Sequence, residues 1–208
     1  MDILQTKKML VYVAEKIMEN QEYLCRVDAQ IGDGDHGIGM YNGMKKVKET
    51  LESKEFLSIN HLFTTMGMTM TMTMGGASGI LFGTLFMQAF SQEEQFVQLT
   101  TQKFVKGMEN GLKGIQQRVE SKLGDKTMLD ALVPAVECMQ QNSQLQLLEV
   151  LLLAETAAKN GVEATKQYVA KYGRAKFLGE RAIGFQDAGA TSIWLIFSFM
   201  REWVERNG

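Results

Sequence analysis

The sequence of 208 residues has one proline, two cysteines and two histidines, and neither sign of charge is in strong excess. The single proline, together with the absence of a Ser/Gly/Pro-rich linker, leaves no obvious domain boundary. We therefore expect a single domain over residues 1–208. Cys25 and Cys138 lie outside any Cys-x-x-Cys pair, which is typical of inert thiols in a reducing cytoplasm.

Charge and hydropathy argue against two classes of partner. The formal net charge of −2 is spread over both halves of the chain, so no basic face is available for nucleic acid or anionic lipid. No apolar run reaches about 18 residues. The N-terminal MDILQTKKMLVYVAEKIMEN mixes charges into its apolar positions and lacks a cleavage site. We expect a cytoplasmic protein that does not span a membrane, and any phosphate chemistry would need added cations.

Most of the chain places apolar residues at the helical period. Several of the predicted helices begin at an Asp, Ser or Thr, the residue types that cap helices. Pro134 predicts a kink in its helix or a start displaced toward it. The predicted helices run from a cap at Asp2 through Ile17, and over Met40–Leu51, Thr100–Val119, Thr127–Gln140, Ser143–Tyr172 and Asp187–Arg206.

The segment TTMGMTMTMTMGG alternates Met with Thr or Gly, a period of two that taken alone favours a strand. We interpret it as a helix, because an isolated strand would have no partner in a chain that is otherwise helical. About eight amphipathic helices and no sheet then remain. The predicted fold is all-α, an up-and-down bundle or closed helical barrel whose loops build a site at one end.

Three aspartates fall in the glycine-rich stretch DAQIGDGDHGIGM: Asp28, Asp33 and Asp35. Two unit charges 4 Å apart repel by about 4 kcal/mol at an effective dielectric of about 20. Either the three side chains point apart into solvent, or a cation joins them. An EF-hand is excluded, because a loop starting at Asp28 or Asp33 would place Gly39 or Met44 where the closing Glu is required. Oxygen ligands without a Cys or His cluster favour Mg²⁺, and Mg²⁺ suggests a nucleotide.

The same loop contains a literal Gly-x-Gly-x-x-Gly, but it follows no predicted strand and encloses two aspartates, so we reject a dinucleotide fingerprint. A Walker A sequence is absent as well. A second loop, GGASGILFG, could approach phosphate through its backbone and Ser78, although small residues also allow tight helix packing. Lys126, Arg174 and Arg181 are candidate cationic partners for phosphate.

Four segments in fixed order carry a resemblance: DAQIGDGDHG, GGASGILFGTLF, GDKTMLDALVP and FLGERAIGFQDAGATS. With them the chain resembles, nearly from end to end, the ADP-binding L subunits of bacterial dihydroxyacetone kinases, called DhaL. The resemblance implies a barrel of eight amphipathic helices. It also implies a nucleotide, ADP or ATP, held at one end of the barrel through Mg²⁺, with two ions expected.

The resemblance places the metal ligands on Asp28, Asp33 and Asp35. His36 is expected to donate a hydrogen bond to phosphate rather than to act as a general base. The family often has Gly, His and Pro where this chain has Val119, Phe185 and Ala188, so details on the adenine side are open. With a phosphate cradle at Gly76 to Gly79, the candidate nucleotide-binding residues are His36, Gly37, Ile38, Gly39, Gly76, Ala77, Ser78, Gly79, Thr127, Met128, Arg174, Asp187, Ala188 and Gly189.

The function that the resemblance implies is phosphoryl transfer to dihydroxyacetone held on a separate, DhaK-like subunit, so that the chain is active only with its partner. Phosphate could come from free ATP, or from bound ADP rephosphorylated by a DhaM-like phosphotransferase-system protein. Alternatives are the same fold serving another small ketose or a fatty acid, and a non-catalytic nucleotide sensor that contacts a transcription regulator. His61 is expected to cap a helix or lie at the surface.

Overall fold

The computed structural model describes residues 1–208, which form nine α-helices and one 3-10 helix without a β-sheet. The all-α prediction is therefore confirmed. The elements are α1 (Ile3–Glu19), α2 (Gln21–Asp28), α3 (His36–Glu52), α4 (Ile59–Thr73), α5 (Gly76–Ala89), α6 (Thr101–Gln116), α7 (Leu129–Gln141), α8 (Leu147–Thr165), η1 (Arg174–Ala182) and α9 (Ala188–Asn207).

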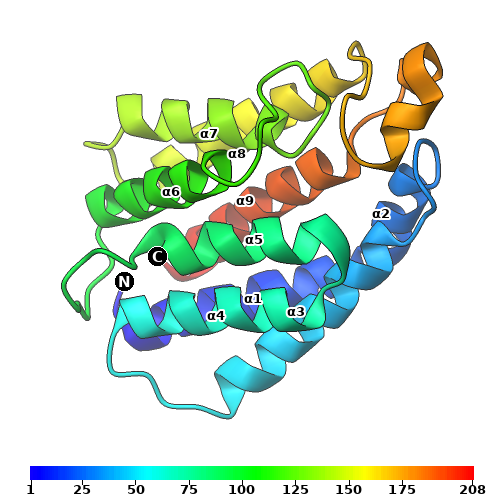
Figure 1. Ribbon diagram of the computed structural model, residues 1–208. Coiled ribbons are helices and arrows are strands. Elements are labelled where there is room, and N and C mark those ends of the chain that lie inside the picture. The colour runs from blue at the N-terminus through cyan, green and yellow to red at the C-terminus, as the bar shows by residue number, and fades with distance from the viewer.

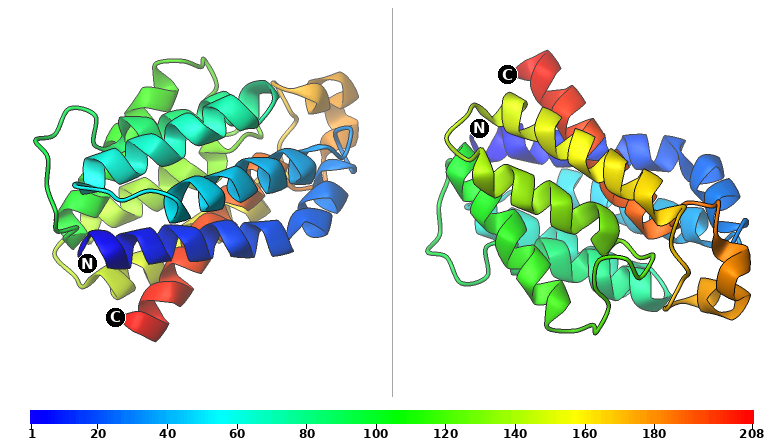
Figure 2. Two further views of the ribbon diagram at one scale, coloured as in Figure 1. Left: turned by 90° about the horizontal axis from the view of Figure 1, so that it is seen from below. Right: turned by 90° about the horizontal axis from the view of Figure 1, so that it is seen from above.

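Eight of the helices form a closed ring (Figures 1 and 2). Each helix from α3 to α9 packs against the next one in the chain, and α1 closes the ring by contacting both α3 and α9. The apolar faces meet inside the ring in one cluster of 49 buried residues. This arrangement confirms the predicted closed up-and-down barrel. The short helices α2 and η1 lie outside the ring, at one end of it (Figure 1).

The up-and-down order gathers alternate connections at the same end of the barrel. The α2–α3, α4–α5, α6–α7 and α8–α9 connections lie together at one end, and both chain termini lie toward the other (Figure 1). These four connections contain the glycine-rich segments singled out from the sequence. The topology therefore brings segments up to about 160 residues apart in the chain to one place.

The Met/Thr segment is helical, as α4. On a helix, side chains four residues apart share a face. Met66, Met70 and Met74 are buried in the core, whereas Met68 and Met72 are exposed. The threonine hydroxyls of this segment donate to the carbonyl one turn earlier, for example Thr69 to Thr65 at 2.8 Å. The period of two therefore does not describe a strand, since only every second methionine faces the core.

The helix starts were predicted with mixed success. Asp2, Thr100 and Asp187 each cap a helix by accepting a backbone N–H. Ser143 does not start α8, which begins after a capping box at Gln146. The predicted end at Tyr172 is wrong as well, because α8 ends at Thr165.

Helix α7 begins at Leu129, with Met128 at the N-cap position, and Pro134 lies inside it. The Thr127 hydroxyl nevertheless accepts the N–H of Leu129 at 3.3 Å, so Thr127 does bond to the start of this helix. The carboxylate of Asp130, in the first turn of α7, bonds to the loop before the helix. It accepts hydrogen bonds from the N–H groups of Gly124 (2.6 Å) and Thr127 (2.7 Å), and so folds the preceding loop onto the start of the helix.

A buried lysine in the α6–α7 loop joins this loop to the end of α8 and to the segment before α9. Lys126 is 2% exposed, and its ammonium donates to the carbonyls of Thr165 (2.6 Å) and Phe185. Its φ of +60° is unusual for a residue with a side chain, so the two bonds stabilise a backbone conformation that is otherwise disfavoured. The Thr165 hydroxyl also accepts the N–H of Asp187 at 3.0 Å.

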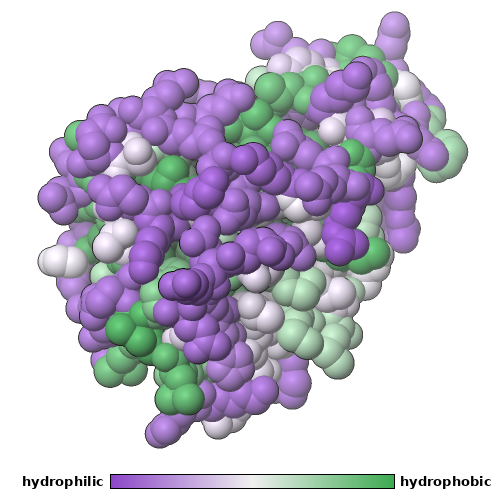
Figure 3. Space-filling model, turned by 60° about the vertical axis from the view of Figure 1, so that its left-hand side comes forward, coloured by the Kyte–Doolittle hydropathy of each residue, from purple (hydrophilic) through white to green (hydrophobic).

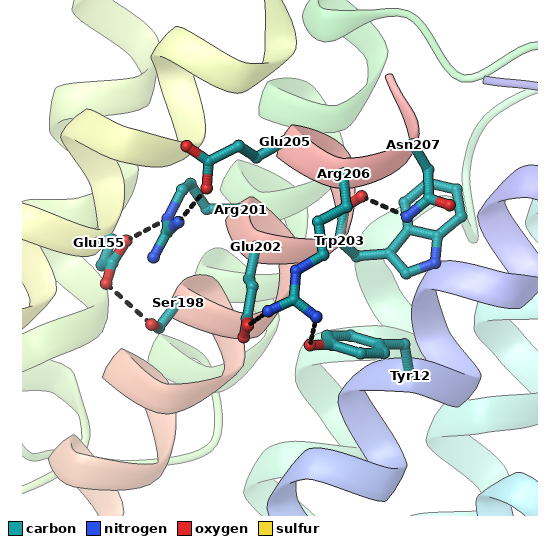
Figure 4. Close-up of polar contacts among 9 residues, drawn as sticks. All are labelled: Tyr12, Glu155, Ser198, Arg201, Glu202, Trp203, Glu205, Arg206 and Asn207. Carbon is teal, nitrogen blue, oxygen red and sulfur yellow. Dashed lines mark hydrogen bonds and ion pairs between the residues drawn. The ribbon is translucent and has the colours of Figure 1, made fainter.

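At the opposite end, polar contacts join α9 to its neighbours on either side (Figure 4). Arg201 pairs with Glu155 of α8 at 2.8 Å, and Glu155 also accepts the Ser198 hydroxyl at 2.8 Å. Arg206 donates to the Tyr12 hydroxyl of α1 at 3.2 Å. These contacts support the closure of the ring, although exposed ion pairs contribute little individually.

None of the helices is long and apolar enough to cross a bilayer. The face in Figure 3 is largely hydrophilic, with hydrophobic side chains in separate patches. The larger apolar side chains left exposed include Leu57, Met72 and Phe177.

Gly161 of α8 allows the closest approach to α7. A Cβ at this position would overlap the Asp130 carbonyl oxygen and lie 2.8 Å from the Ala131 Cα, both backbone atoms that cannot rotate away. Gly161→Ala should therefore lower Tm by several degrees, even though alanine in a free helix gains about 1 kcal/mol over glycine. Asn160→Ala, at the exposed neighbouring position, is the control and should be near neutral. A stabilised Gly161→Ala protein would contradict this packing.

Burial raises the pKa of Asp187 to about 7, against its N-cap hydrogen bond from Ala190, which lowers it. The folded state then binds a proton that the unfolded state has already released, so this carboxyl lowers stability as pH rises from about 4 through about 7. Asp187→Asn removes the titration and retains a capping side chain. The free energy of unfolding, measured with denaturant in EDTA, should therefore exceed that of wild type in the Asp187→Asn protein by more at pH 8 than at pH 5. An equal difference at both pH values would refute the shift.

Candidate functional site

The aspartate loop brings its three carboxylates together. Asp28 ends α2, Asp35 precedes α3, and one carboxylate oxygen from each of Asp28, Asp33 and Asp35 lies within 4.8 Å of the others. Glycine is required within the turn. A Cβ at Gly32 would come within 2.5 Å of the Asp28 carboxylate, and Gly34 has a φ of +77°. The three carboxylates therefore lie together in the structure and do not point apart into solvent.

Arg174 lies against this cluster. Its guanidinium forms an ion pair with Asp33 and approaches Asp35, with 3.6 Å between Nη2 and Oδ2. Arg174 begins η1, which the topology places beside the α2–α3 loop (Figure 1). A residue far from the aspartates in sequence thus supplies positive charge to two of the three carboxylates.

A cavity of about 710 Å³ opens beside the aspartates. Gly37 and Gly79 do not line it. They are buried where α3 packs on α2 and where α5 packs on the α4–α5 turn, since a Cβ at either would meet backbone atoms there. The predicted residues that do line it are Asp28, Asp33, Asp35, His36, Ile38, Gly39, Gly76, Ala77, Ser78, Thr127, Met128, Arg174, Asp187, Ala188 and Gly189.

The N-terminus of α5 faces this cavity without a side-chain cap. The N-cap residue is Gly75, which has no side chain to accept a hydrogen bond from the first N–H groups of the helix. Gly76 has a φ of +65°. Gly76 and Ala77 are exposed. The first backbone N–H groups of α5 are therefore available to an anion, and the helix dipole favours negative charge at this point.

His36, at the start of α3, links three helices. Its Nε2 lies 2.8 Å from the Ser192 hydroxyl of α9, and its Nδ1 lies 3.4 Å from the Ser78 hydroxyl of α5. Burial lowers the pKa of His36, against the nearby Asp28 charge, which raises it. The imidazole is thus neutral at pH 7, which fits a hydrogen-bonding role better than that of a charged partner for phosphate.

Two of the cations suggested as phosphate partners differ from Arg174: Lys126 lines the cavity but its ammonium is already hydrogen-bonded, and Arg181 lies outside the cavity. The ammonium of Lys126 is committed to the backbone carbonyls of Thr165 and Phe185, so its role is structural. Arg181 is exposed, donates to the Leu178 carbonyl at 3.3 Å and does not line the cavity. The existing bonds of the Lys126 ammonium and the position of Arg181 outside the cavity both count against a contact with phosphate. A loop position alone does not reveal the direction of a long side chain.

An apolar wall of the cavity was largely missed by sequence reasoning. Leu81, Phe82, Ile115 and Leu129 line it beside Met128 and Val119. These residues continue the helical apolar pattern of α5, α6 and α7, so nothing in the sequence distinguishes them from ordinary core residues. Tyr172 and Asn42 also line the cavity and carried no motif.

Comparison with known proteins gives a consistent picture. The family model described as the DAK2 domain matches residues 30–202. The chain is 38% identical over 181 residues to the PEP-dependent dihydroxyacetone kinase, ADP-binding subunit DhaL of Escherichia coli K12, and the match covers 86% of each chain. It is also 38% identical over 186 residues to the corresponding DhaL of PEP-dependent dihydroxyacetone kinase 1 from Listeria innocua, with 89% of each covered.

A solved structure shares the fold. The crystal structure of the dihydroxyacetone kinase from C. freundii in complex with AMP-PNP and Mg²⁺ matches 94% of this chain with a TM-score of 0.74 and 25% identity. The match spans 33% of that kinase chain. From the domain match and the identity to curated DhaL subunits over most of its length, the chain belongs to the DAK2 domain family and, within it, to the DhaL subunits of dihydroxyacetone kinases.

Proposed function

We propose that the chain is the nucleotide-binding, phosphoryl-transfer subunit of a dihydroxyacetone kinase and that all 208 residues form its single domain. The observation that carries the proposal is the position of the aspartate cluster. Three carboxylates with oxygens within 4.8 Å of one another lie at the edge of a 710 Å³ cavity that also meets the uncapped N-terminus of α5. A Mg²⁺ nucleotide matches both features, since the metal suits the carboxylates and the phosphates suit the helix end.

The donor set of the cluster fits magnesium. All three side chains offer oxygen, no Cys or His joins them, and Asp33 and Asp35 are exposed, which leaves room for water and phosphate ligands. Asp28, Asp33 and Asp35 would hold the metal, with two ions proposed. When bound, Mg²⁺ neutralises the charge of the phosphates. The guanidinium of Arg174 contacts two of the same carboxylates, so in the loaded site we expect it to turn toward phosphate.

The remaining parts of the nucleotide match the rest of the cavity. The N–H groups at Gly76 to Ser78 would bind the outer phosphates, and the Ser78 hydroxyl lies at the same helix end. The apolar wall of Leu81, Ile115 and Met128 suits the adenine ring. Val119, which stands where the family often has glycine, also lines the cavity.

The acceptor is proposed to lie on a second protein. The chain has two histidines, and His61 is exposed at the start of α4, at the end of the barrel away from the cavity. In the cavity lining, both ring nitrogens of His36 and the ammonium of Lys126 are already engaged in hydrogen bonds, so neither is free to hold a ketone covalently. A DhaK-like subunit would therefore present dihydroxyacetone at the open cavity, and its docking would exclude water. Phosphate would come from ATP or from bound ADP that a DhaM-like donor recharges.

The metal assignment can be tested by calorimetry. Asp33→Asn and Asp35→Asn should each weaken Mg-ADP binding by at least about tenfold, because even groups that only support metal ligands cost that much when lost. The circular-dichroism spectrum should stay close to wild type and the Tm without ligand should not fall, since both side chains are exposed and each substitution also removes a repelling charge. Glu22→Gln makes the same charge change at an exposed site on α2 and should leave affinity unchanged. Unchanged affinity in both aspartate variants would refute the metal site.

The proposed partnership can be tested by reconstitution. The isolated chain with Mg-ATP and dihydroxyacetone should form no dihydroxyacetone phosphate. Adding a purified dihydroxyacetone-binding subunit should start turnover, with ATP alone or with a phosphotransferase donor. The partner alone and the partner with Asp35→Asn protein are the controls, and both should be inactive. Sustained product formation by the lone chain would contradict the subunit assignment.

A further inference from the structure

A hydrogen-bonded chain of three side chains leads from the barrel interior to the cavity. It runs from Ser192 of α9 through the His36 imidazole to Ser78 of α5, with distances of 2.8 and 3.4 Å. Ser78 and His36 line the cavity, whereas Ser192 does not and is fully buried. Ser192 therefore cannot touch a ligand, and any effect it has on binding must pass through His36.

The direction of these hydrogen bonds follows from the partners available. The Ser192 hydroxyl makes one hydrogen bond, with His36 Nε2. If Nε2 carried the imidazole proton and donated it, the hydroxyl proton of a fully buried serine would have no acceptor, which is costly. If Ser192 donates instead, Nε2 is the acceptor and the proton of a neutral imidazole lies on Nδ1.

The proton on Nδ1 determines what Ser78 can do. Nδ1–H then donates to the Ser78 oxygen, so the hydroxyl proton of Ser78 is free to point into the cavity. In the opposite tautomer, Nδ1 is an acceptor and competes for that proton. A neutral histidine with both nitrogens paired can thus decide whether a neighbouring serine acts as a donor toward an anion.

We propose that Ser192 is a positioning residue that holds His36 as the Nδ1–H tautomer and thereby keeps the Ser78 hydroxyl as a donor to a phosphate oxygen of the bound nucleotide. The role of Ser78 rests on the proposed function, whereas the tautomer of His36 does not. The aspartate residues and the metal take no part in this assignment.

Histidine ¹⁵N spectroscopy on the full chain tests the tautomer. With only two histidines, long-range ¹H–¹⁵N spectra at pH 8 in EDTA contain two imidazoles, and the exposed His61 serves as an internal reference. Wild-type His36 should show a protonated Nδ1 and an unprotonated Nε2. Ser192→Ala should shift His36 toward the Nε2–H form and leave His61 unchanged. A wild-type Nε2–H tautomer, or a Ser192→Ala spectrum identical to wild type, would overturn the proposal.

Ser198→Ala is the matched control. Ser198 lies on the same helix, and its hydroxyl also bonds to another helix, through Glu155 at 2.8 Å (Figure 4), but neither residue lines the cavity. This variant should change neither the His36 spectrum nor the affinity for Mg-ADP.

Calorimetry with Mg-ADP then tests the consequence for Ser78. Ser192→Ala should weaken binding by about three- to tenfold, the effect of one neutral hydrogen bond. A shifted tautomer with unchanged affinity would overturn the role given to Ser78. A wild-type protein that fails to bind Mg-ADP would instead contradict the proposed function, and the spectra would still decide the assignment of Ser192.

Discussion

Repulsion among three carboxylates is the constraint on which the glycine-rich end of this protein depends. Charges held about 4 Å apart repel by about 4 kcal/mol per pair at an effective dielectric of about 20, so the cluster requires positive charge beside it. In the structure Arg174 meets two of the carboxylates. The loop reaches this arrangement only because Gly32 and Gly34 allow a turn that closes Asp28 against the residues that follow.

The barrel supplies the rigidity that such a loop lacks. Eight helices in a closed ring leave no free edge, and every second connection emerges at the same end. At the cavity, the buried Lys126 joins the loop after α6 to the last residue of α8 and to the segment before α9 through backbone carbonyls. Burial and hydrogen bonds in the surrounding segments therefore keep the aspartate cluster in place. A stable fold can maintain a strained or repulsive site in this way.

Much of the fold could be predicted from the sequence, because helical periodicity and N-caps are local signals. Asp2, Thr100 and Asp187 cap the expected helices, and tertiary context decided in favour of a helix for the Met/Thr segment. The aspartates were recognisable because three charges in one short loop are costly. Lys126 and the Ser192–His36 contact could not be predicted, since each depends on side-chain direction across segments that only the tertiary structure brings together.

The central claim is that the three aspartates bind the metal of a metal–nucleotide complex. The most direct measurement is a crystal structure of the protein with ADP and Mn²⁺, an anomalous scatterer that takes the same oxygen ligands as Mg²⁺. The account predicts an anomalous peak within bonding distance of oxygens from Asp28, Asp33 and Asp35, with the ADP phosphates between that peak and the N-terminus of α5. Nucleotide bound in the cavity with Mn²⁺ held elsewhere, or with the aspartates still paired only with Arg174, would contradict it.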